Sequence, residues 1–356
     1  MVCSFTALDE YFGVVPAPLR FERFEGDIVA LAKTVDGLGF PGLPYADAVA
    51  DTVAGVATKD QSVRVRYSCS DGEASTAYPQ ARLVRLPGKR AFDARGGVYE
   101  SLREISPIPD KAAPELVLFE AAALASRYAY DPDPASIPQA VRSLPPVYQR
   151  DLLELVVSGA RPDKGFEILR RSGFLDLYWP EIAELSGVQH AKDFHPEGDV
   201  WRHTMETFAH RKSLDLTLSL GLLLHDTGKP DAVASGGKRF DKHSELGEMA
   251  AKACLARLGY PRNTIESVAF LVRYHMLPAA LSRVPPSSIG RILDDPLMPV
   301  LLELYRCDEL STFRGPDGYY EACAAYKAYL KNSRNPYRDS DGKRRDALHR
   351  PGPRAL

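Results

Sequence analysis

The sequence contains no apolar stretch long enough to span a bilayer, and its first residues lack the pattern of a secretory signal peptide. Its five cysteines include no Cys-x-x-Cys pair, which argues against a thiolate zinc site and a disulfide framework. We therefore expect free thiols, a cytoplasmic location and no membrane partner. The net charge of −2 also excludes nucleic-acid binding by overall charge alone.

The chain does have the composition of an ordinary globular protein, with 356 residues of which 45% are hydrophobic and 26% charged. Ser62–Cys69 and Ala81–Leu86 alternate apolar and polar residues, which predicts two strands. From about Pro114 the pattern is helical, so we predict a mainly α protein. The predicted helices are Leu116–Tyr128, Val147–Ser158, Gly165–Ser172, Leu214–Leu224 and Ser244–Leu258, followed by one for which Asn263 and Glu266 suggest a capping box.

One predicted buried helix ends in two residues of the kind that bind metals. The run Leu214–Leu224 is mostly apolar and stops at His225 and Asp226. A buried carboxylate without a partner is costly, whereas a bound cation favours an ionised carboxylate beside a neutral imidazole. We therefore expect a divalent metal at this helix end.

Further candidate ligands fall on other helices or helix ends. His243 opens an Ala-rich helix, His275 lies near the end of the next one, and Asp308 lies on a later helical segment. A helical bundle can direct such side chains into one core pocket. Mixed imidazole and carboxylate ligands suit one or two ions of Mn, Fe, Co, Ni or Mg better than a structural zinc site. Such metals support phosphoester hydrolysis, because they polarise a phosphoryl oxygen and acidify a bound water.

The order of these residues resembles the HD superfamily of metal-dependent phosphohydrolases, whose minimal pattern is H…HD…D. The residues that match this pattern are His203, His225, Asp226 and Asp308. The resemblance implies that these four hold a first metal, and that His243 and His275 hold a second one with Asp226 as the bridge. Lys229, in the HDTGK run, matches a lysine that approaches the scissile phosphate in some members. The resemblance thus implies catalytic roles for Asp226 and Lys229.

The remaining histidines, His190, His195, His210 and His349, fit no position of the pattern. Of these, His195 comes nearest to a role, because HPEGD directly precedes the metal motif. His195 and Glu197 could orient the ligands from outside the centre.

A longer part of the chain, from about Leu116 to Leu330, resembles bacterial tRNA nucleotidyltransferases and poly(A) polymerases that carry an HD domain. Leu169–Ile182 is similar to the segment that ends the family's helical neck, and Phe92–Ile105 to the stretch after its catalytic core. The resemblance implies three parts, which are a small α/β region like a decayed nucleotidyltransferase head (1–110), a helical neck (111–190) and the HD domain (191–331). Residues 332–356 are rich in Arg, Lys, Asp, Pro and Gly and poor in apolar side chains, which predicts a disordered basic tail.

The first 110 residues lack the signature of nucleotidyl transfer. That reaction requires a Gly-Gly or Gly-Ser turn followed by two carboxylates side by side on a strand, which hold two Mg ions. Asp47 and Asp51 stand at a helical spacing instead, and Arg20–Asp27 does not supply the family's Arg-Arg-Asp run. These residues predict a shortened head that binds RNA or packs as a structural cap.

Three functions are compatible with the sequence. The leading one is an HD-type phosphohydrolase that acts on a nucleotide or an RNA-end phosphoester, such as a 2′,3′-cyclic phosphate, through metal-activated water. The second is a protein like tRNA nucleotidyltransferase or poly(A) polymerase in RNA processing, active or degenerate, with tRNA or another RNA as partner. The third is a non-catalytic RNA-binding module whose metal serves stability. The sequence does not determine the oligomeric state.

Overall fold

The computed structural model describes three short strands and most of the chain after residue 113. The strands are β1 (Arg64–Arg66), β2 (Arg82–Leu86) and β3 (Arg90–Asp93), and the other described ranges are 114–127, 131–140, 144, 146–189, 198–234, 240–312 and 315–344. Several sequence predictions lie outside these residues. They concern Arg20–Asp27, Asp47, Asp51, residues 94–105, His190, His195, Glu197 and His349.

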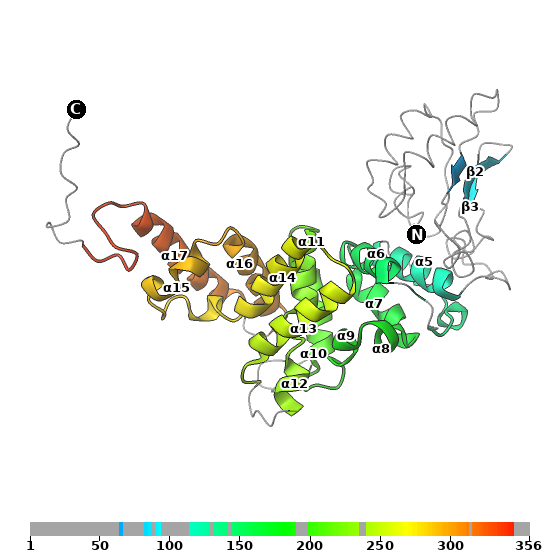
Figure 1. Cartoon of the computed structure of the whole chain (residues 1–356), viewed down its shortest axis with the longest axis horizontal. Helices are drawn as coiled ribbons and strands as arrows, with labels where there is room; N and C mark the ends of the chain where they lie inside the picture. The colour runs from blue at the N-terminus through cyan, green and yellow to red at the C-terminus, as the bar shows by residue number, and fades with distance from the viewer. Residues whose placement is uncertain are drawn as a thin grey trace. The chain divides into compact units, whose positions relative to one another are not determined.

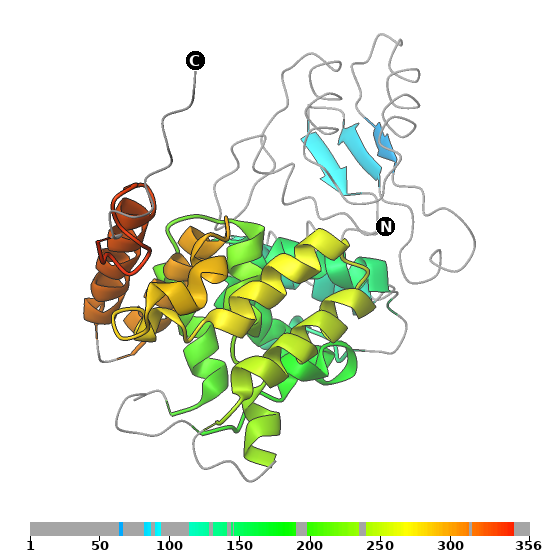
Figure 2. The same ribbon diagram turned by 60° about the vertical axis from the view of Figure 1, so that its left-hand side comes forward.

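The described strands form one antiparallel sheet in the order β1-β2-β3. Arg64 pairs with Val84, and Leu83 pairs with Asp93. Figure 2 shows the three strands side by side. The two predicted strands are present, each within its predicted stretch, whereas the sequence analysis missed β3.

The described residues from 114 onward are mainly helical, which confirms the predicted fold class. The chain divides into two compact units, of which the first comprises Met1–Ala183 and Cys254–Tyr260. Its described helices are α5 (Pro114–Arg127), η1 (Pro134–Ser136), α6 (Pro146–Val157), α7 (Pro162–Arg171), α8 (Phe174–Tyr178) and α9 (Pro180–Ala183). α5 packs against both α6 and α7 (Figure 1).

An aromatic cluster forms much of the core of this unit. Trp179 is fully buried, and its ring meets those of Phe174 and Phe166 edge-on, with centroid distances of 5.0 and 6.3 Å. Gly173 has a φ of 72° between α7 and α8, a conformation that glycine adopts without steric cost. The segment Leu169–Ile182 therefore builds a turn and a hydrophobic core.

The second unit comprises Glu184–Ala253 and Pro261–Leu356. Its described helices are, in chain order, α10 (Val200–Thr207), η2 (Phe208–His210), α11 (Leu216–Leu224), α12 (Lys229–Ala234), α13 (His243–Arg257), α14 (Arg262–Tyr274), η3 (Pro278–Ala280), α15 (Pro286–Leu293), α16 (Met298–Leu310) and α17 (Asp317–Ser333). The last turn of α13 belongs to the first unit. α11 is the central helix, because it contacts α10, α14 and α16 and its residues from Leu218 to Leu224 are buried. None of the described helices is both long and apolar enough to cross a membrane.

Two aspartates fix the starts of the helices that carry the first histidines. The Asp199 carboxylate accepts a hydrogen bond from the Trp201 backbone N–H at 2.7 Å, and Asp215 accepts one from the Leu218 N–H at 2.8 Å. Such caps satisfy backbone donors that the first turn leaves unpaired. They therefore fix where α10 and α11 begin.

The predicted capping box at Asn263 is wrong. α14 begins at Arg262 after Pro261, and its start has no side-chain cap. Glu266 instead pairs with Lys252 on α13 at 3.3 Å. The Glu266 carboxylate, which the local pattern predicted to cap α14, thus forms an ion pair with Lys252 of the neighbouring helix α13.

Residues 332–344, the described part of the predicted tail, include several side-chain hydrogen bonds. The Ser287 N–H and hydroxyl both donate to the Asp341 carboxylate at 2.8 Å. The Lys343 N–H donates to Asp339 at 2.7 Å, and Gly342 takes a positive φ in the same turn. Side-chain hydrogen bonds of this kind order a polar segment that has few apolar residues to bury.

Candidate metal centre

The end of α11 places two candidate ligands in the core of the second unit. His225 is the C-cap residue and Asp226 follows it, and each is only 1% exposed. The His225 ring donates from Nδ1 to the Leu222 carbonyl at 2.8 Å, while the Thr227 hydroxyl donates to the Leu224 carbonyl at 2.7 Å. The turn therefore uses its own side chains to satisfy the last carbonyls of the helix.

Gly228 allows this turn to touch the start of α13. A Cβ atom at Gly228 would lie 2.9 Å from the carbonyl carbon of His243 and closer still to the His243 oxygen and the Gly247 nitrogen. These are backbone atoms that cannot rotate away. The glycine of the HDTGK run is therefore required for close backbone approach, and this approach brings His243 toward Asp226.

The structure brings all six candidate ligands together from five segments. His203 lies on α10, His225 and Asp226 follow α11, His243 begins α13, His275 follows α14 and Asp308 lies on α16. Neighbouring imidazole rings lie at centroid distances of 5.7 Å (His203 to His225), 5.4 Å (His225 to His275) and 4.9 Å (His275 to His243). The side chains divide into two sets that could each hold an ion, with the ligand atoms of a set within 4.8 Å of one another. The sets are His203, His225 and Asp308, and Asp226, His243 and His275.

Every imidazole of the cluster has its Nδ1 bound to an oxygen outside the centre. The Nδ1 atoms of His243 and His275 lie 2.8 and 2.7 Å from the carbonyls of Phe240 and Val272. For His203 the partner is the Ser311 hydroxyl at 3.2 Å, whose own proton goes to the Asp308 carbonyl. A carbonyl can only accept, so Nδ1 must carry the proton in each ring and Nε2 presents a lone pair to the centre.

These lone pairs face one another or face carboxylates at short range. The Nε2 atoms of His243 and His275 are 3.0 Å apart, and His203 Nε2 lies 2.8 Å from the Asp308 carboxylate. His225 Nε2 is buried without a hydrogen bond and lies 3.2 Å from the Asp226 carboxylate. Acceptors at such distances require a proton or a metal cation between them. The donor set therefore fits one or two divalent cations.

The pKa shifts show that the buried carboxylates of the cluster need positive charge beside them. Burial lowers the pKa of His275 to about 3 and also lowers the pKa of His243, although the charge of Asp226 opposes both shifts. Burial alone would raise the pKa of Asp226 and Asp308. Positive charge on His225 and Lys229 nevertheless lowers the Asp226 pKa well below its usual value, and a protonated His203 that donates to Asp308 does the same for that carboxyl. Each buried carboxylate therefore needs a positive charge beside it, which a bound cation supplies while the imidazoles stay neutral.

Lys229 lies at the edge of the cluster. Its ammonium donates to Asp226 Oδ2 at 2.6 Å and lies 5.3 Å from the centre of the Phe240 ring. Phe240 has a φ of 54°, which is unusual for a bulky residue, and its carbonyl accepts the proton of His243 Nδ1. One residue thus contacts both Lys229 and His243.

Sequence reasoning missed Phe240 and Ser311, because each acts through a single backbone or hydroxyl oxygen and has no ligand-like spacing. His210 lies apart from the cluster, as its ring is 3.9 Å from Glu206 and its carbonyl accepts a hydrogen bond from Arg306. Cys307, beside Asp308, is buried, and burial raises its pKa to about 12. A thiol in that state is a poor metal ligand and a poor nucleophile.

Comparison with known proteins finds similarity over part of the chain to a CC-adding tRNA nucleotidyltransferase and to multifunctional CCA proteins. No protein-family model matches the chain. A CC-adding tRNA nucleotidyltransferase of Thermus thermophilus is 32% identical over 194 residues, which are 52% of this chain and 43% of that protein. Multifunctional CCA proteins of Laribacter hongkongensis (30% over 180 residues, 48% and 44%) and Halorhodospira halophila (29% over 150 residues, 42% and 35%) are also similar.

The match therefore covers less than half the length of each of these relatives. None of these three relatives carries a name that describes a phosphohydrolase. The HD-type hydrolase stays a prediction that these relatives do not test.

Proposed function

We propose that this chain is an RNA-processing protein related to tRNA nucleotidyltransferases, and that its second unit hydrolyses a phosphoester of a nucleotide or an RNA end at a divalent metal centre. The hydrolytic part depends on one observation, the four Nε2 lone pairs and two carboxylates that converge at the end of α11. The RNA-processing part is supported by the similarity to the CC-adding tRNA nucleotidyltransferase.

Each ligand set would hold one ion. His203, His225 and Asp308 form one set, and Asp226, His243 and His275 the other. Imidazole and carboxylate ligands without thiolate suit Mn, Fe, Co, Ni or Mg. When bound, such an ion polarises a phosphoryl oxygen and lowers the pKa of a water molecule.

Asp226 connects the two sets. Its Oδ1 atom lies 3.9 Å from the Nε2 atoms of both His243 and His275, whereas Oδ2 faces His225 at 3.2 Å. One carboxylate therefore offers an oxygen to each side. Substitution of Asp226 should weaken both sites together, whereas substitution of His203 should weaken only one.

Lys229 supplies positive charge for the substrate. Its side chain is 11% exposed, so the ammonium lies at the edge of the buried cluster. Contact with Asp226 and with the Phe240 ring restricts the positions that the ammonium can occupy. From there it would bind a phosphoryl oxygen and stabilise the negative charge that develops during hydrolysis.

Elemental analysis coupled to a phosphoesterase screen tests the proposal. We expect the purified protein to contain a divalent transition metal or Mg, and to hydrolyse at least one of 2′,3′-cyclic nucleotides, nucleoside monophosphates or RNA with a terminal phosphate. Asp226→Asn and His275→Gln should abolish turnover, while His210→Gln, a histidine of the same unit outside the cluster, should keep it. Turnover that survives Asp226→Asn would assign the activity to another site or to a contaminant.

Nucleotidyl transfer is the second candidate, because the similar proteins include a CC-adding tRNA nucleotidyltransferase. It requires a carboxylate pair in the first 110 residues that sequence analysis does not identify. Incorporation of labelled CTP into tRNA with Mg would detect it. The hydrolytic proposal expects this activity to be absent or to be unaffected by Asp226→Asn.

The third candidate is a metal centre that serves stability only. In that case Asp226→Asn lowers the melting temperature, but the wild-type protein hydrolyses none of the phosphoesters, whichever divalent metal is supplied. The phosphoesterase screen therefore separates this candidate from the hydrolase.

A further inference from the structure

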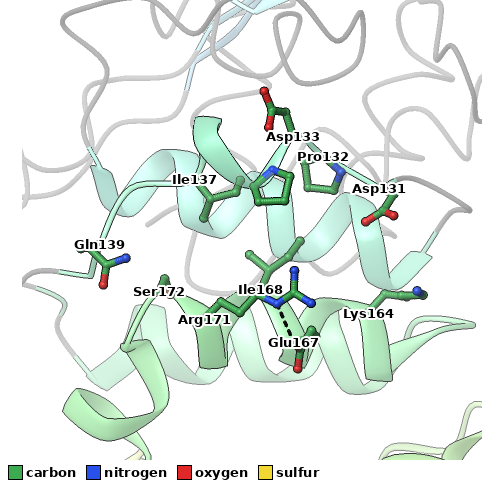
Figure 3. A pocket seen from close by; sticks show the side chains of 11 residues that line it. Asp131, Pro132, Asp133, Ile137, Gln139, Lys164, Glu167, Ile168, Arg171 and Ser172 are labelled. Carbon is green, nitrogen blue, oxygen red and sulfur yellow. Dashed lines mark hydrogen bonds and ion pairs between the residues drawn. The ribbon is translucent and has the colours of Figure 1, made fainter.

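A polar cavity lies in the first unit, away in sequence from the histidine cluster. Its volume is about 370 Å³, and it opens between the segment 131–139 and helix α7 (Figure 3). This volume is within the range of small-molecule sites, roughly 300–1,000 Å³. The cavity therefore accepts a ligand of about the size of one nucleoside.

The lining combines aliphatic walls with polar groups of both charges. Pro132 and Ile137 come from the loop and Ile168 from α7, so apolar surface lies on opposite sides of the cavity (Figure 3). Asp131 and Lys164 also line it. Within the described part of the chain, neither the carboxylate nor the ammonium of this pair has a hydrogen bond or an ion pair.

Arg171, whose side chain is 61% exposed, is bound through one nitrogen at the same cavity. Its Nε donates to the Glu167 carboxylate at 2.6 Å, the contact drawn in Figure 3. Glu167 is also bound by Arg170, which donates to both of its oxygens at 2.9 Å. The terminal nitrogens of Arg171 have no partner among the described residues, so they remain available as paired donors.

We infer that this cavity binds a single guanine base. A flat aromatic ring would pack against the aliphatic side chains, and its edge would have to offer donors to Asp131 and acceptors to Arg171 and Lys164. Guanine offers both, with N–H donors at N1 and N2 and acceptors at O6 and N7, and Arg and Lys are the side chains that most often contact O6 and N7. Adenine and cytosine each offer one amino group and uracil one ring N–H, so they match a carboxylate less fully.

The same chemistry is present in a free guanine nucleotide and in an unpaired guanine of RNA. Nucleosides are the best first probes, because they carry no phosphate and so have no anionic group for the proposed metal centre. Isothermal titration of the full chain in EDTA should show guanosine binding at least about tenfold more tightly than adenosine, cytidine or uridine, the discrimination typical of one bidentate contact to a base edge. This result does not depend on whether the second unit is a hydrolase.

Two variants and one matched control test the assignment. Arg171→Ala and Asp131→Asn should each reduce guanosine affinity at least about fivefold and diminish the preference over adenosine. Arg170→Ala removes a neighbouring arginine that also pairs with Glu167 but does not line the cavity, and it should leave the affinity unchanged. Circular dichroism melting of each variant checks that the fold is intact.

Uridine pentamers with and without one central guanine identify the source of the base. Tighter binding of the guanine-containing pentamer than of guanosine indicates an RNA strand, and weaker binding indicates a free nucleotide; both agree with a guanine site. Equal binding of all four nucleosides, no binding of any, or guanosine affinity that Arg171→Ala leaves unchanged would overturn the inference.

Discussion

Replacement of Gly228 by alanine tests how the backbone builds the histidine cluster. The added Cβ would lie 2.9 Å from the His243 carbonyl carbon and nearer still to the His243 oxygen and the Gly247 nitrogen. Because both partners are backbone, the clash is relieved only by moving the turn away from α13. Overpacking typically costs about 1–3 kcal/mol, and we expect the upper end here, about 3 kcal/mol.

Such a loss should lower the melting temperature by roughly 6–12 °C, since about 1 kcal/mol corresponds to about 2–4 °C in a domain of this size. The same movement separates His243 from Asp226, so manganese affinity should fall as well. Thermal melting and manganese titration measure the two effects independently.

Two glycines of the same unit serve as controls for Gly228→Ala. A Cβ atom at Gly221 would lie 2.8 Å from the end of the Leu271 side chain, and this side chain can rotate away from it. A Cβ atom at Gly290 would have no neighbouring atom nearer than 3.9 Å. We therefore expect a smaller loss for Gly221→Ala and none for Gly290→Ala, where alanine also favours the helix by up to about 1 kcal/mol. Wild-type stability and manganese affinity in Gly228→Ala would refute the steric argument.

The other predictions concern residues that position the cluster. Asp199→Ala removes the cap of α10 and should cost about 1 kcal/mol, which thermal melting detects; an unchanged melting temperature would exclude the cap as a stabilising contact. Ser311→Ala removes the oxygen that orients His203 and should weaken manganese binding about 10–100-fold in titrations, with little effect on the melting of metal-free protein. Phe240→Leu keeps the backbone carbonyl but removes the ring beside Lys229, so kcat/KM for a phosphoester should fall roughly two- to fivefold while manganese affinity stays unchanged. A loss of manganese affinity in Phe240→Leu would show that the ring supports the ligands themselves.

The sequence predicted the helical parts of the fold well, because hydrophobic periodicity reports directly on burial. The apolar run before His225 became the central helix α11, and the histidine and aspartate stand at its end as expected. His243 and His275 were found because they stand at helix ends, where a side chain can leave the helix and reach a shared centre, whereas His203 lies within α10 and was found only through the resemblance to the H…HD…D pattern. The role of these residues as metal ligands stays a prediction.

Contacts made between distant segments were not predictable in the same way. The Glu266 carboxylate pairs with Lys252 instead of capping α14, and the Asp341 carboxylate accepts two hydrogen bonds from Ser287. Each of these two contacts depends on which distant segment packs beside the residue, and the local sequence pattern does not contain that information. The orienting contacts of Phe240 and Ser311 were missed for the same reason.

The most direct test of the account is pulsed electron paramagnetic resonance of the metal-stripped protein reloaded with manganese. We predict coupling of the bound ion to imidazole nitrogens, reduced by His225→Gln and retained in His210→Gln. Manganese that couples only to solvent protons and oxygen ligands, or nitrogen coupling that His225→Gln leaves intact, would contradict a metal centre at the end of α11.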